Sequence, residues 1–270
     1  MWGIIPAAGR GSRIQPLAFS KELLPVGSRI DGQTERPCAV SEYLVERMIE
    51  GGADKICFVI GPGKSDILQY YGAGYGPTPV AYVVQPSPAG LCDAIFRAAP
   101  FIGEDPVLVG LPDTVWFPRD GFASLPDDPL SFLLFPVDRP EFFDAVLLTG
   151  QDRVRQIEVK KPGDPSRWIW GAFKMPGRVL RDLNALWIKR DRQDEYIGTL
   201  VNAYIEAGGV AIGVKTGRAY VDVGTLDGYR SATRLLERMA RQGATGPLAA
   251  MPAPAPRSAS RALPRLVAER

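Results

Sequence analysis

The stretch Trp2-Gly-Ile-Ile-Pro-Ala-Ala-Gly-Arg-Gly-Ser-Arg13 opens the chain with an apolar run that ends in a glycine-rich turn. Such a run is typical of a buried strand that leads into a tight loop. Residues 40–49 then carry apolar side chains at helical spacing as far as Gly51-Gly52, and the β-branched run Lys55–Ile60 follows. This order predicts a β-α-β unit with parallel strands and a right-handed crossover.

The alternation of helix-like and strand-like segments continues beyond this unit. We expect a helix over 64–71, a strand over 80–85, a helix over 89–98 and a strand over 106–111. Later segments predict strands at 132–137, 145–148, 154–160, 168–173 and 210–214, and helices at 178–186, 195–207 and 226–241. The chain is therefore predicted to be an α/β protein with a mostly parallel, Rossmann-like mixed central sheet, flanking helices and a small antiparallel β insertion over 131–174.

The domain prediction divides the chain near its C-terminus. Residues 1–244 are expected to form one domain. Residues 245–270 are rich in Ala, Pro and Ser, as in Met251-Pro-Ala-Pro-Ala-Pro-Arg257. Such a composition cannot bury enough apolar area to offset the entropy of ordering, so we expect a mobile tail.

Charge and cysteine content limit the partners and the compartment. The net charge of +2 is the small difference between 32 basic and 30 acidic residues, which does not indicate nucleic acid or a membrane surface as partner. No signal-peptide-like leader or membrane-spanning apolar run is evident, so a cytoplasmic location is expected. Cys38, Cys57 and Cys92 are odd in number and lack CxxC spacing, which predicts reduced, buried thiols.

The 270 residues include no histidine. This absence excludes Ser-His and Cys-His nucleophile pairs, imidazole acid-base catalysis and histidine metal sites. The remaining chemistry uses Asp, Glu, Lys, Arg and a hard cation, which suits phosphoryl and nucleotidyl transfer.

The loop after the first strand is a candidate phosphate-binding loop. Its residues Ala8, Gly9, Gly11 and Ser12 would turn backbone N–H groups toward phosphate oxygens, and Arg13 would clamp a phosphate. A bare G-x-G also fits an ordinary turn. The dinucleotide fingerprint is incomplete, which argues against a dehydrogenase.

The segment Gly61-Pro-Gly-Lys64-Ser65 imitates a P-loop. Phe58 stands where the Walker pattern requires glycine. We therefore predict a turn with a lysine cap rather than a nucleotide-binding loop.

The next segment, Pro16-Leu-Ala-Phe-Ser-Lys21-Glu-Leu-Leu-Pro25, carries a specific resemblance. Together with the opening loop it resembles the G-x-G-[ST]-R-x-x-P-L and [PS]-K-x-L-x-P signature of sugar nucleotidyltransferases, especially glucose-1-phosphate thymidylyl- and uridylyltransferases. The resemblance implies that Arg13 polarises the leaving phosphates and that Lys21 neutralises charge at the α-phosphate. Lys21 lies two residues closer to Pro16 than is usual in the family, which predicts a shorter loop.

The segment Gln85-Pro-Ser-Pro-Ala-Gly90-Leu is similar to the family's Q-P-x-P-x-G-L base-recognition turn. The amide of Gln85 offers an acceptor and two donors that match N3–H and O4 of uracil or thymine. A flipped amide also matches cytosine, and the sequence does not decide between UTP and dTTP. A proline-stiffened loop leaving a strand is the alternative interpretation.

Two aspartates resemble the family's Mg²⁺ ligands: Asp113 in an L-x-[GP]-D segment, and Asp222 in a D-x-G-T segment. One or two carboxylates with substrate phosphates and water are the ligands that Mg²⁺ usually takes. Either aspartate alone would suit a turn or a helix cap. The pair, within this ordered set of motifs, favours a metal site.

The sugar half of the site departs further from the family. Lys161 matches the lysine of an E-K-P segment that holds the sugar phosphate, but Lys160 stands where the preceding carboxylate is expected. The segment Trp170-Gly171-Ala172 stands where the family commonly has T-G-x, and Ala145 stands where it often has glycine. The identity of the sugar therefore stays open, with glucose 1-phosphate as the first expectation.

The resemblance covers residues 2–240 and implies a Mg²⁺-dependent transfer of a nucleoside monophosphate from UTP or dTTP to a sugar 1-phosphate, with release of pyrophosphate. A sugar 1-phosphate has a second pKa of about 6 and is already an anion at neutral pH, so the reaction requires no general base. The alternatives are a non-catalytic sugar-nucleotide-binding regulator and an enzyme with another phosphorylated acceptor. The sequence leaves a homo-oligomer open.

Overall fold

The computed structural model describes residues 1–163 and 166–241. The helices are α1 (Val40–Glu50), α2 (Ser65–Tyr71), α3 (Gly90–Ile102), α4 (Gly177–Lys189), α5 (Ile197–Glu206) and α6 (Leu226–Arg241), with short 3₁₀ turns at Lys21–Leu23, Gly121–Ser124 and Pro140–Phe142. The strands are β1 (Trp2–Ala7), β2 (Pro25–Asp31), β3 (Thr34–Ala39), β4 (Lys55–Ile60), β5 (Gly74–Tyr75), β6 (Thr78–Val84), β7 (Val107–Gly110), β8 (Thr114–Phe117), β9 (Leu130–Pro136), β10 (Asp144–Leu148), β11 (Val154–Val159), β12 (Trp168–Met175), β13 (Ala211–Val214) and β14 (Ala219–Asp222).

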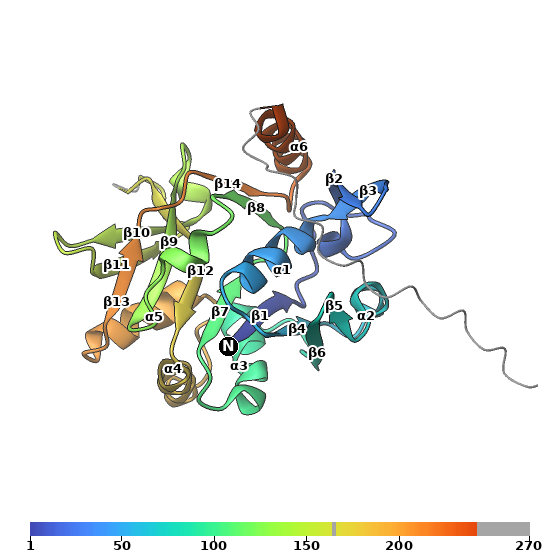
Figure 1. Ribbon diagram of the computed structural model, residues 1–270. Coiled ribbons are helices and arrows are strands. Elements are labelled where there is room, and N and C mark those ends of the chain that lie inside the picture. The colour runs from blue at the N-terminus through green and yellow to red at the C-terminus, as the bar shows by residue number, and fades with distance from the viewer. Residues whose placement is uncertain (164–165, 242–270) are drawn as a thin grey trace, which may run out of the picture.

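A ten-stranded mixed sheet organises the described part of the chain (Figure 1). Its strand order is β11-β10-β12-β7-β1-β4-β6-β5, with β9 paired to β12 and β13 paired to β9. The four strands β7, β1, β4 and β6 are parallel to one another. The predicted α/β class with a mostly parallel central sheet is confirmed.

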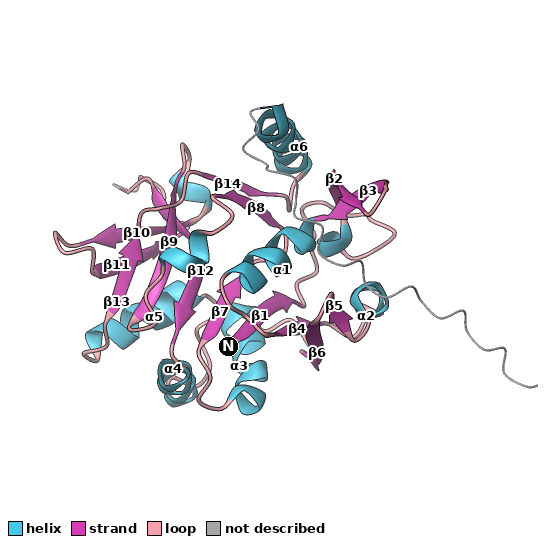
Figure 2. Cartoon of the chain, viewed as in Figure 1, coloured by secondary structure: helices cyan, strands magenta, loops and turns pink. Residues whose placement is uncertain are grey.

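Helices cover both faces of this sheet (Figure 2). Neighbouring residues of β1 point to opposite faces, so Ile4 packs in the core formed with α3, α4 and α5, whereas Ile5 packs in the core formed with α1. Both side chains are fully buried, and each such burial stabilises the fold by about 1.5–3 kcal/mol. The continuous apolar run of β1 follows from this burial on two sides.

The predicted antiparallel insertion is present as β9 to β12. Because β12 pairs antiparallel with β7, these strands extend the central sheet instead of forming a separate layer. The division into residues 1–244 and a tail remains a prediction, since 245–270 lies outside the described residues.

The strands β2, β3, β5, β8 and β14 were not predicted from sequence. Strands β2 and β3 form a hairpin beside α1, and β8 pairs antiparallel with β14. The second pairing places Asp222 opposite Thr114, the residue after Asp113. It therefore brings together two chain segments that are more than a hundred residues apart.

A buried ionic network fastens the hairpin to α1. Glu42 is fully buried and accepts hydrogen bonds from the guanidinium groups of Arg29 and Arg36, the hydroxyl of Tyr70 and the backbone N–H of Ala39. Burial alone would raise the pKa of Glu42, but these hydrogen bonds outweigh it and lower the pKa to about 2. The hairpin is thus fastened to α1, and its first strand begins directly after the turn that carries Lys21.

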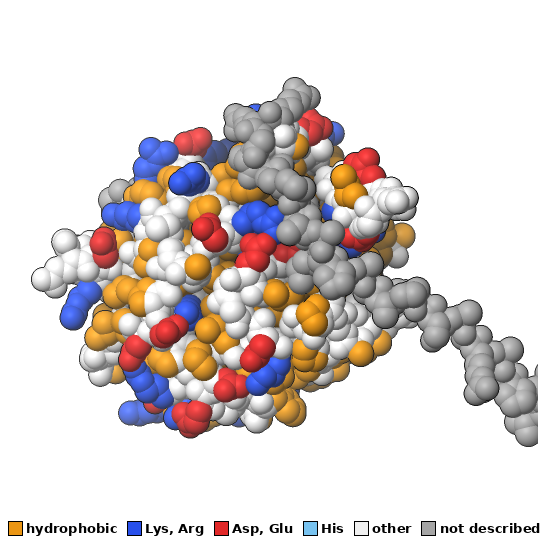
Figure 3. Space-filling view, in the orientation of Figure 1, with side chains coloured by type: hydrophobic (Ala, Val, Ile, Leu, Met, Phe, Trp, Pro, Cys, Tyr) orange, Lys and Arg blue, Asp and Glu red, His pale blue; other side chains and the backbone are white. Residues whose placement is uncertain are grey.

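The surface and the thiols agree with the composition. Lys and Arg side chains are interspersed with Asp and Glu on the face seen in Figure 3. Cys38, Cys57 and Cys92 are buried free thiols, as expected. Among the described residues, every helix is too short or too polar to span a bilayer.

Candidate active site

The candidate site lies at the carboxyl edge of the parallel strands, where open α/β sheets bind ligands. The loops that leave β1, β4 and β7 carry residues 8–20, 61–64 and 111–113, and Gln85 follows β6 directly. Parallel pairing of these strands brings their carboxyl ends to a common edge. Most sequence-predicted residues of the triphosphate half therefore come from this edge.

Lys21 and Asp113 form an ion pair at the base of the site. The Nζ atom of Lys21 lies 2.5 Å from Oδ2 of Asp113, and the two side chains are only 15% and 11% exposed. Burial lowers the pKa of Lys21, but the charge of Asp113 outweighs it and leaves that pKa raised. Burial raises the pKa of Asp113, but Lys21 outweighs it and leaves that pKa lowered. Both groups are therefore charged at neutral pH.

Asp222 and Arg13 form a second pair beside the first. Arg13 Nη2 donates to Oδ2 of Asp222 at 3.0 Å, and the backbone N–H of Gly224 donates to Oδ1 at 2.7 Å. A Cβ atom on Gly224 would lie 2.8 Å from Asp222 Oδ1, 3.0 Å from Arg13 Nη2 and 3.3 Å from Asp113 Oδ2. Both predicted carboxylates and the predicted arginine thus surround one point.

The glycine-rich loop lies over Lys21. Gly11 has φ +64°, and a Cβ atom there would lie 2.6 Å from Cδ of the Lys21 side chain. Ala8 is buried at the end of the strand, and its carbonyl oxygen would lie 3.3 Å from a Cβ on Gly61. Gly9 and Ser12 are exposed. The loop therefore presents backbone and hydroxyl groups to solvent above the charged cluster.

Lys64 takes part in a pair that sequence reasoning missed. The predicted turn is present, since the Lys64 N–H donates to the carbonyl of Gly61 at 3.0 Å. Lys64 is the N-cap residue of α2, as predicted, although its side chain makes no capping hydrogen bond. Nζ instead lies 2.6 and 2.8 Å from the carboxylate oxygens of Glu22, which is 1% exposed. Glu22 adjoins Lys21, so this pair supports the turn that positions it.

Gln85 and Gly90, the two residues predicted to recognise the base, lie together in the turn between β6 and α3. Gln85 is buried, and its Nε2 donates to the carbonyl of Gly90 at 3.2 Å. Gly90 has φ +87°, and a Cβ atom on it would lie 2.6 Å from Cα of Glu195. The carbonyl of Glu195 accepts the N–H of Leu91 at 2.7 Å. Only glycine fits this position, where the first turn of α3 rests on a distant backbone segment.

The predicted sugar-phosphate residues occupy different environments. Lys161 is 63% exposed and its Nζ lies 3.1 Å from Oε1 of Glu158. Ala145 is fully buried in β10, and Glu158 is the residue of β11 that pairs with it. A Cβ atom on Gly171 would lie 2.6 Å from the Tyr220 ring. The carboxylates and the sugar-phosphate residues therefore do not form one directly bonded cluster in the described residues.

Tyr220 lies between the two halves of the site, a position that no sequence pattern indicated. Its ring packs on Phe135 and Phe143, with centroids 5.3 and 5.8 Å away. Burial raises the pKa of its hydroxyl, and the nearby charges of Asp222 and Asp113 raise it further. The phenol is therefore neutral and forms an apolar wall beside the carboxylates.

The donor set suits a hard divalent cation. Asp113 and Asp222 both border the space that a Cβ on Gly224 would fill, and this residue has no side chain to fill it. Groups of three or more potential metal-ligating side chains are absent from residues 1–163 and 166–241. Two carboxylates supplemented by phosphate oxygens and water are within the usual ligand set of Mg²⁺.

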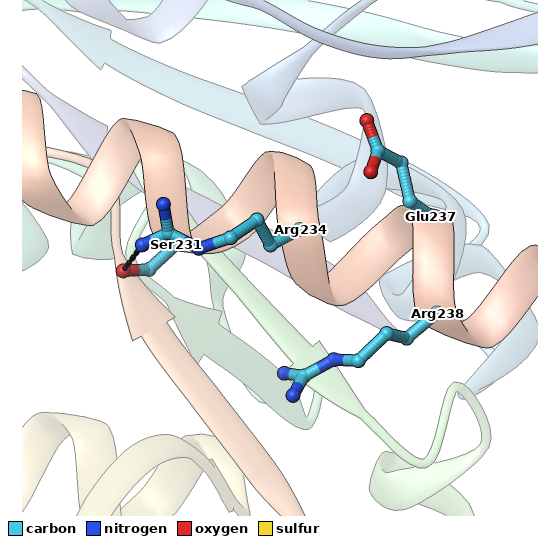
Figure 4. A pocket seen from close by; sticks show the side chains of 4 residues that line it. All are labelled: Ser231, Arg234, Glu237 and Arg238. Atoms are coloured by element: carbon cyan, nitrogen blue, oxygen red, sulfur yellow. Dashed lines mark hydrogen bonds between the residues drawn. The ribbon is translucent and has the colours of Figure 1, made fainter.

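A separate pocket of about 260 Å³ lies on the outer face of α6 (Figure 4). It is lined by Ser231, Arg234, Glu237 and Arg238, and Arg234 Nη2 lies 3.1 Å from the Ser231 hydroxyl. None of these residues belongs to the carboxylate cluster. The pocket is a feature of the helix surface, distinct from the candidate site.

The fold and the site define an α/β protein. At the carboxyl edge of its sheet it presents a glycine-rich loop, two positively charged side chains and two carboxylates. The chain belongs to the nucleotidyl transferase family, whose model matches residues 2–239. The resemblance inferred from sequence is thereby confirmed at the level of the family.

Individual relatives agree with this assignment. A glucose-1-phosphate thymidylyltransferase of Neisseria meningitidis is 26% identical over 250 residues, which are 88% of this chain and 83% of that protein. A low-salt glycan biosynthesis nucleotidyltransferase of Haloferax volcanii is 30% identical over 176 residues, 61% of this chain but only 46% of that protein, so the match spans about half its length. The UTP-bound UGPase of Acinetobacter baumannii has a TM-score of 0.70 at 19% identity, covers 88% of this chain and 93% of its own, and supports the fold.

Proposed function

We propose that the chain is a Mg²⁺-dependent sugar 1-phosphate nucleotidyltransferase that uses UTP or dTTP and releases pyrophosphate. The observation that carries this proposal is the gathering of Asp113, Asp222 and Arg13 around Gly224, with Lys21 paired to Asp113. Opposite charges are held here in fixed positions, as transfer of a nucleotidyl group requires. The names of the relatives in Neisseria and Haloferax support the same reaction class.

The residues of the triphosphate half have separable roles in this proposal. Arg13 is 62% exposed and therefore free to turn from Asp222 toward the β- and γ-phosphates that leave. Lys21 is largely buried and stays beside Asp113, where it neutralises charge at the α-phosphate. The backbone of Gly9 and Gly11 and the hydroxyl of Ser12 donate to phosphate oxygens.

Asp113 and Asp222 are the proposed Mg²⁺ ligands. The bound cation would offset negative charge on the reacting phosphates. The sugar 1-phosphate oxygen then attacks the α-phosphorus in line, the bond to the β-phosphate oxygen breaks, and pyrophosphate leaves with that electron pair. No histidine or other general base is needed, because the attacking phosphate is already ionised at neutral pH.

The sugar half supports a less specific assignment. Lys161 is proposed to hold the phosphate of the acceptor, and the buried Ala145 and Gly171 are proposed to support the sugar site from within β10 and β12. Lys160 lies with Nζ 4.6 Å from the centroid of Tyr196 and occupies the place where a carboxylate was expected. Glucose 1-phosphate remains the first acceptor to test. The buried thiols suit a reducing compartment, and the cytoplasm is the proposed location.

The test is release of pyrophosphate from a panel of nucleoside triphosphates and sugar 1-phosphates with and without Mg²⁺. The proposal predicts release that needs a uridine or thymidine triphosphate, a sugar 1-phosphate and Mg²⁺ together, and that falls at least 10²-fold in Asp113→Asn and Asp222→Asn. Binding of sugar nucleotides without release under any combination would identify a regulator instead. Release with a phosphorylated alcohol alone would identify another acceptor.

A further inference from the structure

The orientation of the Gln85 amide is dictated by two partners. Its Nε2 lies 2.7 Å from Oδ2 of Asp93 and 3.2 Å from the carbonyl oxygen of Gly90. A carboxylate and a carbonyl can only accept hydrogen bonds, so the NH₂ group must face them. The two ends of an amide cannot be told apart by shape, but here the chemistry of the partners decides between them.

Asp93 is itself held in place by Arg97, one turn further along α3. Arg97 Nε and Nη2 lie 3.1 and 3.2 Å from the two carboxylate oxygens of Asp93, in a bidentate pair. Asp93 is 10% exposed at its side chain, whereas Arg97 is 41% exposed. A bidentate guanidinium fixes the direction of the carboxylate as well as its charge. The chain of contacts Arg97, Asp93, Gln85 therefore runs from the surface to the base-recognition turn.

This arrangement leaves the amide oxygen of Gln85 for a ligand. In the described residues, Oε1 accepts no hydrogen bond, and it is not among the fully enclosed polar atoms that lack a partner. Gly90 begins α3, so its N–H has no acceptor within the helix. A fixed acceptor and a backbone donor thus lie together at the turn. Because Gln85 is only 4% exposed, its amide cannot rotate without breaking the contacts behind it.

We propose that Asp93, held by Arg97, is a positioning residue that fixes Gln85 Oε1 as the acceptor for a base ring N–H, so that uracil or thymine is selected over cytosine. The inference rests on the proposed function for the assignment of Gln85 to the base. N3 of uracil and thymine carries a hydrogen that Oε1 can accept, whereas N3 of cytosine carries a lone pair. In the same register cytosine would set two acceptors against each other, which a buried site rejects strongly.

The test is equilibrium binding of UTP against CTP, and of dTTP against dCTP, in the presence of Mg²⁺ and without a sugar phosphate. The unchanged chain should bind the uracil or thymine triphosphate at least tenfold more tightly than its cytosine counterpart. In Asp93→Asn the new amide can accept or donate, Gln85 is free to turn, and this ratio should narrow by about tenfold. If Asp93 only stabilised α3, its replacement would weaken the binding of both triphosphates equally and leave the ratio of their affinities unchanged.

Two further variants keep the inference falsifiable if Asp93→Asn does not fold. Arg97→Met removes a half-exposed side chain and should narrow the ratio by a few-fold through loss of the hold on Asp93. Asp105→Asn breaks an ion pair with Lys55 at the opposite edge of the sheet, 2.9 Å long, and should leave the ratio unchanged. An unchanged ratio in both the Asp93 and Arg97 variants, or equal binding of UTP and CTP by the unchanged chain, would overturn the inference. Discrimination in binding without any pyrophosphate release would refute the proposed enzyme while leaving the role of Asp93 intact.

Discussion

Replacing Gly224 by alanine is the sharpest steric perturbation of the proposed metal site. The backbone of Gly224 does not adopt a positive φ, so alanine is conformationally permitted there. The added Cβ would lie 2.8 Å from Asp222 Oδ1, whereas ordinary contact begins at 3.4 Å, so this oxygen must move by about 0.6 Å. The same Cβ would also lie 3.0 Å from Arg13 Nη2 and 3.3 Å from Asp113 Oδ2, both closer than ordinary contact. One methyl group therefore disturbs three charged groups together.

The expected effect is a large loss of activity with a small loss of stability. Misplacement of reacting groups by a fraction of an ångström to 1 Å costs up to about 10²-fold in rate, and we expect kcat/KM for pyrophosphate release to fall by that factor. Overpacking by one methyl group costs about 1–3 kcal/mol, so the Tm should fall by no more than roughly 10 °C. The concentration of Mg²⁺ needed for half-maximal rate should rise, because two ligands are displaced.

The matched control is Gly150→Ala, at an exposed glycine with no atom within 4 Å of the added Cβ. It should leave both the rate and the Tm close to those of the unchanged chain. If Gly224→Ala kept the rate and the Mg²⁺ dependence of the unchanged chain, the placement of the site around Gly224 would be wrong. Equal losses in both variants would also contradict it, because only one of them meets charged atoms.

Lys21→Met should lower kcat/KM by about 10²-fold in the pyrophosphate-release assay and should raise the pKa of Asp113, which loses its charge partner; an unaltered rate would exclude Lys21 from the reaction. The lowered pKa of Glu42, about 2 in the folded protein against a usual 4.5, stabilises the fold above pH 4.5, and this contribution is lost as the pH falls toward 2. Urea unfolding at several pH values should therefore show a free energy of unfolding that falls below pH 4.5. In Glu42→Gln this free energy should fall less steeply with pH, and an equally steep fall would contradict the assigned pKa. Gly90→Ala forces a side chain into φ +87° and against the backbone of Glu195, so the Tm should fall and UTP binding should weaken, as calorimetry would show; retention of both would mean that the base turn adapts.

Apolar runs and the glycines beside them were enough to predict the central strands. β1 and β4 are continuous apolar runs bounded by glycine, and both lie close to their expected positions. The β8–β14 pairing was missed because its two short strands are about a hundred residues apart. Each strand also contains a polar residue, Thr114 in β8 and Asp222 in β14, which interrupts the apolar pattern. The β2–β3 hairpin was missed because Arg29 and Arg36 break its apolar alternation. The burial of Arg29 is explained only by its ion pair with Glu42 of α1.

In the candidate site, too, the sequence indicated residues but not the contacts between them. Motif spacing indicated Asp113 and Asp222, but only the fold shows Gly224 as the point that both carboxylates face. The spacing of Asp93 and Arg97 is a common helical ion pair, and its link to Gln85 depends on how β6 meets α3. In the sugar half, the departures at Ala145 and Lys160 were visible in the sequence, but the close approach of Tyr220 to Gly171 shows only in the fold.

The most direct measurement of the central claim is the fate of labelled phosphorus. UTP and dTTP, each labelled with ³²P at the α- or the γ-position, would be incubated separately with Mg²⁺, the full chain and a sugar 1-phosphate, beginning with glucose 1-phosphate, and the products would be separated. Nucleotidyl transfer at the site of Asp113, Asp222, Arg13 and Lys21 predicts the α-label in a sugar nucleotide and the γ-label in pyrophosphate. Label that stays in both UTP and dTTP with every sugar 1-phosphate tried, or γ-label that appears as inorganic phosphate, would contradict the account.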